Sequence, residues 1–236
     1  MTENKEIERI KKEYDRRARE IPVAFYSLKQ PGNRLMYDQR KEKMLELLKV
    51  AKILPLENKK ILEVGCGSGI WLEDFSNWDV PQKNLYGLDL ETHLIEKAKA
   101  VLPNANLSPG NAENLPWPDK FFDVVLQSTM FTSILDPRLK QKIAHEMRRV
   151  LKENGVILWY DFRYDNPKNR NVKGITGSEI RKLFPGAKVI LKKATLIPFL
   201  ARWLAPKFLG VCRVLSRIPF MNSHYVGLIR WEPERG

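Results

Sequence analysis

The chain has 236 residues, with 41 Lys and Arg against 28 Asp and Glu, which gives a formal net charge of +13 at pH 7. This length suits one substantial domain with appendages and allows a sizeable core. The positive charge favours anionic partners such as nucleic acid, lipid headgroups, pyrophosphates or acidic sugars. It does not choose among them, and a plain solvated basic face is an equally good interpretation.

The cysteine content and the apolar runs exclude several classes of protein. The two cysteines, Cys66 and Cys212, do not have the spacing of a disulfide framework or of a zinc site, so no metal is predicted. A reduced, cytoplasmic compartment fits this cysteine usage best. Residues 1–20 are densely charged with both signs and do not read as a signal peptide. Because no stretch reaches 18 uninterrupted apolar residues, we expect no membrane-spanning helix.

The N-terminal part predicts two helices. In the first, over residues 5–20, Ile7, Ile10 and Tyr14 recur at helical spacing among charged residues. An aromatic loop with turn residues follows it, and a second helix is expected at about 34–52. We expect these elements to form a helical cover of an active site. The predicted organisation is a cover at 1–55 and a core at 56–236.

The rest of the chain alternates between strand and helix patterns. Strands separated by helix-length crossovers predict a parallel, doubly wound α/β sheet with helices on both faces. We expect a Rossmann-like sheet of seven strands, mostly parallel with one antiparallel edge strand. The predicted strands are 60–65, 84–89, 105–108, 121–127, 155–162, 188–195 and 225–231. The predicted helices are about 69–78, 91–101, 137–152 and one that starts at Thr176 or Ser178 and ends near Phe184.

Between the last two strands, residues 196–222 combine apolar and basic side chains and contain no acidic residue. Pro198, Pro206 and Pro219 predict short pieces here rather than one continuous helix. The favoured interpretation is a lid that is inserted in the core and packs over the substrate. The alternative is peripheral contact with an anionic membrane surface.

A glycine-rich stretch follows the first predicted strand, where residues 61–69 read I-L-E-V-G-C-G-S-G. Alternate glycines let the backbone turn sharply and approach a ligand without a Cβ in the way. A helix behind such a turn points its free N–H groups at the ligand. In open α/β folds this is the place where a nucleotide-like cofactor binds.

Two common kinds of cofactor turn do not fit this stretch. A dinucleotide site needs G-x-G-x-x-G, but Ile70 stands at the third glycine position and the last glycine comes one residue early. A phosphate-binding loop needs Gly-Lys-Ser/Thr, which does not follow here. The stretch therefore predicts a cofactor of another kind.

Residues 63–69, E-V-G-C-G-S-G, resemble the first motif of class I S-adenosylmethionine-dependent methyltransferases, E/D-x-G-x-G-x-G. Further matches at the family's spacing extend the resemblance over about residues 60–162, and the chain looks like the type 11 group of that family. The resemblance implies S-adenosylmethionine as the cofactor and methyl transfer as the activity. It assigns cofactor binding to Glu63, Gly65, Cys66, Gly67 and Gly69.

The later motifs extend the predicted cofactor site. Asp89 and Leu90 end the second strand, where an acidic side chain accepts charge-assisted hydrogen bonds from both ribose hydroxyls. Asn111 and Ala112 resemble the loop that flanks the adenine in this family. The usual residue at position 111 is Asp, so Asn111 keeps a carbonyl acceptor but loses the charge, and we expect binding to be retained at equal or lower affinity. Gln127, in the fourth strand, is expected near the methionine end.

The motifs name the methyl donor and leave the acceptor open. Enzymes that methylate amino groups of nucleic-acid bases often carry Asn/Asp-Pro-Pro-Tyr/Phe after the fourth strand, whereas residues 127–131 read Q-S-T-M-F. The flanks at 14–18, 25–27 and 222–225 are similar to methyltransferases found with bacterial glycan or O-antigen genes. We therefore expect an oxygen of a small molecule or glycan, lipid-linked ones included. A nucleic-acid methyltransferase is the first alternative, and a non-catalytic cofactor-binding regulator is the second; the oligomeric state is not predicted.

Five residues are candidates for acceptor chemistry. An oxygen nucleophile usually needs a base. His224 is a candidate because the charge of histidine changes near neutral pH. Asp161 is a second candidate because the ends of parallel strands face the site in this fold. Tyr14, Tyr26 and Arg163 are predicted to line the acceptor pocket.

Overall fold

A seven-stranded sheet runs through the computed structural model, which describes residues 3–232. The strand order is β3-β2-β1-β4-β5-β7-β6, and the pairs among β1 to β5 are parallel. In the described sheet only β7 runs against the others; it lies between β5 and the edge strand β6. The predicted fold class is confirmed. The strands are β1 (Ile61–Val64), β2 (Leu85–Asp89), β3 (Asn106–Pro109), β4 (Phe122–Ser128), β5 (Leu151–Phe162), β6 (Lys188–Leu196) and β7 (Asn222–Arg230).

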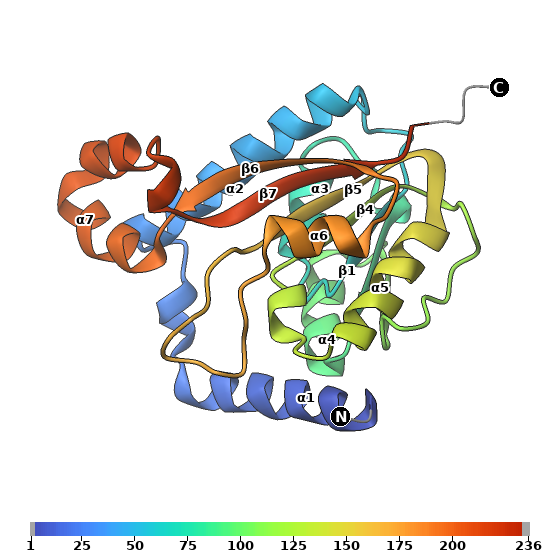
Figure 1. Cartoon of the computed structure of the whole chain (residues 1–236), viewed down its shortest axis with the longest axis horizontal. Helices are drawn as coiled ribbons and strands as arrows, with labels where there is room; N and C mark the ends of the chain where they lie inside the picture. Colours follow the sequence, from blue (N-terminus) through green and yellow to red (C-terminus); the bar gives the residue numbers. More distant parts are fainter. Residues whose placement is uncertain (1–2, 233–236) are drawn as a thin grey trace.

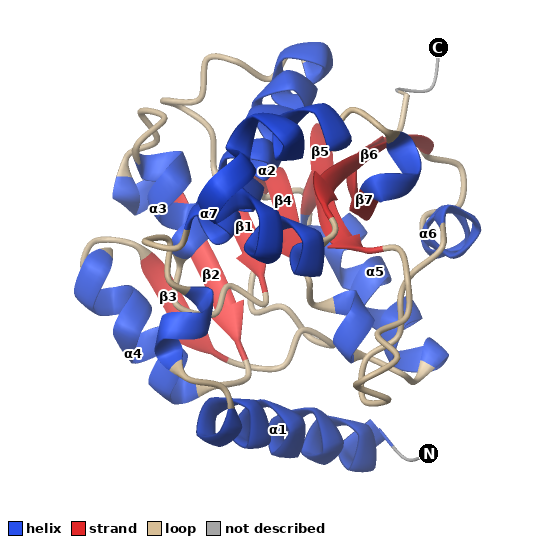
Figure 2. Ribbon diagram, turned by 90° about the vertical axis from the view of Figure 1, so that its left-hand side faces the viewer, coloured by secondary structure: helices blue, strands red, loops and turns tan. Residues whose placement is uncertain are grey.

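Helices cover both faces of this sheet (Figure 1). Residues of α2, α3 and α4 share one buried cluster, and residues of α5 and α6 share a second cluster on the other face. α1 lies below the ends toward which the β1 and β2 arrows point (Figure 2). The helices are α1 (Glu3–Glu20), α2 (Pro31–Ala51), α3 (Ile70–Ser76), α4 (Thr92–Val101), α5 (Pro137–Val150), α6 (Gly177–Leu183) and α7 (Pro198–Leu215), with short 3₁₀ turns η1 (Val23–Tyr26), η2 (Gln82–Asn84), η3 (Phe131–Ser133) and η4 (Pro219–Met221).

The central strands are buried on both faces. Along β5, Leu158 and Tyr160 belong to the cluster under α2, whereas Ile157 and Trp159 belong to the cluster under α5. Such strands read as nearly continuous apolar runs because alternate side chains enter two different cores. This is why the sequence predicts them well.

Local capping explains where the helices on the second face begin. The Asp136 side chain accepts hydrogen bonds from the backbone N–H groups of Arg138 and Leu139, which starts α5. Thr176 accepts from the N–H of Glu179 and starts α6, so it is the cap among the two predicted candidates.

The segment after β6 is divided near its prolines, as the sequence predicts. α7 spans 18 residues but consists of two helical pieces joined at a kink, where Phe208 has non-helical backbone angles (φ −133°, ψ 53°) two residues after Pro206. Pro198 stands in the first turn of α7, where a missing N–H costs nothing. Pro219 begins the separate 3₁₀ turn η4.

Candidate active site

The glycine turn lies between β1 and α3 and is fixed by backbone hydrogen bonds. The N–H groups of Gly65 and Cys66 both donate to the carbonyl of Leu88, at 2.8 and 3.1 Å. Gly65, Gly67 and Gly69 have φ values of +74°, +53° and +81°, which L side chains rarely adopt. A Cβ added at Gly67 would meet nothing within 4 Å. The turn thus leaves open space beside its middle glycine.

The carboxylate of Asp89 stands opposite this turn, at the end of β2. Its Oδ2 accepts from the N–H of Gly67 at 2.8 Å, and its Oδ1 accepts from the N–H of Glu91 at 3.0 Å. Burial raises the pKa of Asp89, and these backbone hydrogen bonds oppose the rise. Each carboxylate oxygen can accept a second hydrogen bond, so the two oxygens fit a pair of neighbouring hydroxyls.

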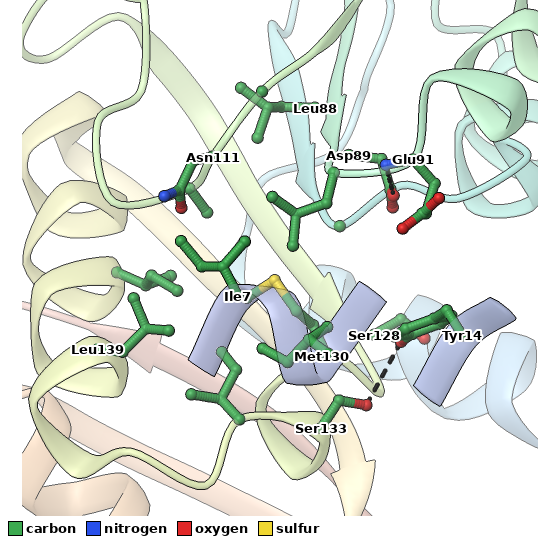
Figure 3. Close-up of a pocket in the computed structure, with 17 residues that line it drawn as sticks. Ile7, Tyr14, Leu88, Asp89, Glu91, Asn111, Ser128, Met130, Ser133 and Leu139 are labelled. Carbon is green, nitrogen blue, oxygen red and sulfur yellow. Dashed lines mark hydrogen bonds between the residues drawn. The ribbon is translucent and has the colours of Figure 1, made fainter. Parts of the chain in front are cut away.

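A pocket opens beside Asp89, between the loops after the strands and α1 (Figure 3). The loop after β3 enters it with Asn111 and Ala112, and Leu90 lines it next to Asp89. The side chain of Asn111 is engaged within its own loop: its Oδ1 accepts from the N–H of Glu113 at 3.1 Å, and its Nδ2 donates to the Glu113 carboxylate. The remaining lining residues are Ile7, Ile10, Tyr14, Gly65, Leu88, Glu91, Gly110, Ser128, Met130, Ser133, Ile134, Leu139 and Ile143.

α1 is held over this pocket by side chains that reach distant loops. Glu6 is fully buried and accepts from the N–H groups of Leu135 and Asp136, at 2.5 and 3.3 Å. Arg9 pairs with Glu6 and also donates to the carbonyl of Ser133 at 2.6 Å. Although burial raises the pKa of Glu6, the hydrogen bonds from Arg9 and Leu135 bring it below its usual value.

Glu13 fixes the other half of α1. It is 5% exposed and accepts from the side chains of Asn169 and Asn171, at 2.7 and 2.8 Å. Its ion pair with Arg16 and these two hydrogen bonds outweigh burial and lower the pKa of Glu13 to about 2. We call Glu6, Arg9 and Glu13 the α1 latch.

The motif acid Glu63 lies on the α2 side of the sheet, away from the lining described above. It is 2% exposed, and its Oε2 has no hydrogen-bond partner among the described residues. Burial raises the pKa of Glu63 well above its usual value, and the charge of Arg40 opposes the rise. The guanidinium of Arg40 stacks over Trp71, 4.6 Å from the ring centroid, and its Nε is also buried without a partner in the described part of the chain.

Gln127 is fully buried and supports the loop that follows β4. Its Oε1 accepts from the N–H of Met130 at 3.3 Å, and its Nε2 donates to the carbonyl of Tyr160 at 3.4 Å. Met130 in turn packs where a side chain at Gly65 would stand, since a Cβ there would lie 2.9 Å from the Met130 sulfur. Gln127 therefore positions Met130, and Met130 packs against Gly65 of the glycine turn.

The two candidate bases lie on opposite faces of the sheet, and neither lines the pocket. Asp161 is fully buried; it accepts from the hydroxyl and the N–H of Thr132, at 2.7 and 3.2 Å, next to the lining residue Ser133. Burial raises the pKa of Asp161 to about 7. His224 is 3% exposed, stacks on Tyr160 at 4.5 Å between ring centroids, and has its pKa lowered to about 3 by burial.

Of the three predicted acceptor residues, the structure places Tyr14 in the pocket lining, with its hydroxyl 3.4 Å from the Ser133 hydroxyl. Tyr26 does not line the pocket; Arg17 donates to the Tyr26 hydroxyl at 3.2 Å and lies over the ring of the lining residue Tyr14. Arg163 is not brought to this pocket. Its guanidinium donates to the carbonyls of Pro219 and Asn222.

The apolar half of the pocket was not predicted as a site. The helical stripe of Ile7, Ile10 and Tyr14 signalled a buried side of α1 but not what that side covers. Leu139 and Ile143 of α5 read as ordinary core positions in the sequence. They meet α1 only because the latch brings the N-terminal helix to residues more than a hundred positions away.

The residues of the site fit S-adenosylmethionine. The open space beside Gly67 and the spare acceptor capacity of Asp89 suit a nucleoside part. Among the described residues, Glu63 Oε2 and Arg40 Nε are a buried acceptor and a buried donor without a partner, which suits the ammonium and carboxylate groups of a methionine part.

Comparison with known proteins agrees with this fit. The family model described as a methyltransferase domain matches residues 61–155. The chain is 33% identical over 137 residues to phthiotriol/phenolphthiotriol dimycocerosates methyltransferase 1 of Mycobacterium ulcerans, covering 57% of this chain and 49% of that protein. It is also 33% identical over 107 residues to demethylmenaquinone methyltransferase of Geobacillus stearothermophilus, covering 43% of this chain and 44% of that protein. The chain thus spans less than half the length of these relatives.

Solved structures share the fold. A putative sarcosine dimethylglycine methyltransferase from Galdieria sulphuraria superposes with a TM-score of 0.59 at 16% identity, over 80% of this chain and 84% of that chain. An S-adenosylmethionine-dependent methyltransferase from Mesorhizobium loti gives 0.56 at 15% identity, over 78% and 96% of the two chains. The chain therefore has the class I fold of these structures, its residues 61–155 match a methyltransferase domain, and S-adenosylmethionine is the methyl donor that this match supports.

Proposed function

We propose that this protein transfers the methyl group of S-adenosylmethionine to an oxygen of a small-molecule or glycan acceptor. The observation that carries the proposal is the pocket under α1, which joins the polar end at Asp89 and Asn111 to an apolar end at Ile10 and Leu139. When bound, S-adenosylmethionine supplies an activated methyl group with its own leaving group. The protein then has to position the acceptor and exclude water.

We assign the polar end of the pocket to the nucleoside of the cofactor. Asp89 accepts from the ribose hydroxyls there, while Gly67 and Glu91 hold its carboxylate in place through their N–H groups. Glu63 and Arg40, on the α2 side, would hold the charged groups of the methionine part. Both are buried, so their hydrogen bonds to a ligand are stronger than in water.

The acceptor, in this proposal, lies against Tyr14 and the apolar side chains of α1 and α5. Water is excluded by α1, which is fixed by three buried or half-buried side chains rather than by a flexible loop. The names of two relatives support a small-molecule acceptor, because they specify phthiotriol dimycocerosates and demethylmenaquinone.

Of the two candidate bases, Asp161 is the better placed for this pocket. Its pKa of about 7 lets it change protonation near neutral pH. The Thr132 hydroxyl donates to it and is adjacent in sequence to Ser133, which lines the pocket. In this proposal Asp161 draws a proton from the acceptor through that hydroxyl. His224 lies on the opposite face behind aromatic rings, and its lowered pKa makes it a weak base.

The nucleic-acid alternative rests on the net charge of +13. A labelling experiment separates the two functions. The protein is incubated with methyl-labelled S-adenosylmethionine and, in parallel, with fractions of polar metabolites, saccharides, lipids and RNA. We expect label in a small-molecule, saccharide or lipid fraction. Label in RNA alone, with binding that falls steeply as salt rises, would instead establish the alternative.

The second alternative, a non-catalytic cofactor-binding regulator, makes a different prediction. It requires cofactor binding without transfer of label to any of the four fractions.

A further inference from the structure

The helix α7 is packed in an unusual way: it buries small side chains and exposes large ones. Ala201, Ala205 and Cys212 are buried, at 0%, 4% and 0% exposure. Phe199 and Trp203 are 72% and 68% exposed, and their rings stack on each other in solvent with centroids 6.5 Å apart. A helix of a soluble core has the reverse distribution. The exposed aromatic side therefore calls for an explanation outside the core.

Close packing against α2 explains why the small residues face inward. A Cβ at Gly32, in the first turn of α2, would lie 2.5 Å from the carbonyl oxygen of Ala201. The two backbones approach so closely at Ala201 that no larger side chain fits between them there, and Leu200, Leu204 and Leu215 pack beside this contact, partly buried. The large apolar residues from the kink onward are exposed too: Phe208 at the kink is 55% exposed, Val214 is 60% exposed, and Phe220 in η4 is 65% exposed.

Positive charge accompanies these exposed apolar residues. Lys207, Arg213 and Arg217 are exposed, and none forms an ion pair with a carboxylate of residues 3–232. The segment 196–222 contains no acidic residue. We define the α7 face as these three cations together with Phe199, Trp203, Phe208, Val214 and Phe220.

We propose that the α7 face docks on the surface of an anionic lipid bilayer. Exposed Trp and Phe side chains insert at the boundary between headgroups and acyl chains, and unpaired Lys and Arg side chains attract anionic headgroups. The protein lies on the membrane rather than across it, because no helix within the described range is long and apolar enough to span one. A second copy of this chain is a poor occupant, since both copies would bring the same unpaired cations together.

Contacts of α7 with the connector between α1 and α2, residues 21–30, link this helix to the pocket. Arg202 of α7 lies over the Phe25 ring at 4.2 Å and donates to the Asn33 side chain at 2.9 Å. The next residue of the connector, Tyr26, accepts from Arg17, which lies over the pocket residue Tyr14. No residue of 196–222 belongs to the pocket lining. The inference therefore goes beyond methyl transfer and does not depend on it.

Flotation with vesicles tests the proposal without cofactor or acceptor. The full chain is mixed with phosphatidylcholine vesicles, with or without phosphatidylglycerol. We expect it to float with the anionic vesicles and to bind the neutral ones at least about tenfold more weakly. Arg213→Glu combined with Arg217→Glu should reduce anionic binding by a similar factor. Phe199→Ser combined with Trp203→Ser should reduce it at least as strongly, because it removes the inserted rings.

Matched control variants stand on α4, away from the α7 face. Lys97→Glu with Lys99→Glu makes the same charge change at exposed positions, and Val101→Ser removes an apolar side chain that is 50% exposed. These should bind anionic vesicles much more strongly than the α7 variants do. Thermal unfolding of every variant shows that the fold is retained.

Quenching by brominated lipids locates the contact. Part of the tryptophan fluorescence should be quenched by brominated acyl chains, and Trp203→Phe should remove that part while vesicle binding persists. Equal binding by the α7 and α4 variants would overturn the proposal, and so would a wild-type chain that does not float. A dimer in sedimentation that Phe199→Ser with Trp203→Ser abolishes, in a chain that binds no vesicles, would assign the face to a second copy instead.

Discussion

The turn that holds the cofactor and the cover over the pocket are built in different ways. The hydrogen bond between Gly67 and Asp89 joins residues 22 positions apart, and it uses a backbone N–H. The α1 latch joins Glu6 to Leu135 across 129 positions and Glu13 to Asn171 across 158. The contact of α7 with α2 joins Arg202 to Asn33 across 169. Short-range backbone geometry thus builds the proposed cofactor site, whereas long-range side-chain contacts build the proposed space for the acceptor.

This difference has an energetic side as well. The turn depends on glycine backbone angles that other residues adopt only with strain. A single substitution there is therefore expected to have a large effect on the turn. The latch depends on carboxylates whose pKa values are lowered in the folded chain, so it is expected to loosen gradually with acid. The following changes test the two regions separately.

Gly67→Val is expected to have the largest effect on cofactor binding. A valine places its side chain in the open space beside the turn and in a backbone region that β-branched residues avoid. We expect affinity for S-adenosylmethionine to fall by more than about a hundredfold, or ~2.7 kcal/mol. Calorimetry measures this, with Gly210→Val as the control, since Gly210 also has an uncrowded Cβ position but lies in α7. Near-native affinity in Gly67→Val would refute the assignment of this space.

Asp161→Asn tests the proposed base. Because Asp161 accepts a proton in its ionised form and has a pKa of about 7, the rate of the wild type should rise with pH through about 7. The variant should lose about a hundredfold in rate, together with this rise, and should retain cofactor affinity. A pH–rate profile checks both effects. An unchanged midpoint in the variant would assign the rise to another group.

Asp89→Ala is expected to weaken cofactor binding at least about tenfold, or ~1.4 kcal/mol, because it removes the charge-assisted acceptor for the ribose hydroxyls. Asp38→Ala, at an exposed position on α2, is the control. Affinity that stays the same in both variants would remove Asp89 from the site.

The smallest effect is expected in the latch. Because the pKa of Glu13 is lowered from 4.5 to about 2, its contribution to stability is fully present above about pH 4.5 and is lost as the pH falls toward 2. After correction for the intrinsic exchange rate at each pH, the protection of the α1 amides against hydrogen exchange should fall over that window in the wild type. Glu13→Gln should exchange several-fold faster at neutral pH and depend less on pH. Identical exchange in both chains would show that Glu13 does not hold α1.

The difference between local patterns and long-range contacts also explains which features the sequence predicts. The succession of strands and helices along the chain, the glycine turn and the place of Asp89 at the end of β2 follow from patterns within about 30 residues, and the fold and the methyl donor are confirmed. The engagement of Asn111 with Glu113 is also local, but a motif names a residue type and not its partner.

The acceptor side could not be predicted in this way. The sequence shows that one side of α1 is apolar. That side packs toward α5, and four strands separate the two helices along the sequence. Arg163 reads as a residue at the end of a strand, yet its guanidinium donates to the carbonyls of Pro219 and Asn222, because the start of β7 pairs with the end of β5. Such placements depend on tertiary contacts that no local pattern encodes.

The most direct test of the central claim is calorimetry of the wild-type chain with S-adenosylmethionine and with its demethylated product. In our proposal the turn at Gly67 and the carboxylate of Asp89, which are joined by a hydrogen bond, bind the nucleoside that both compounds share. We therefore predict that each binds once per chain and that each competes with the other. A wild-type chain that is folded and binds neither compound would contradict the account.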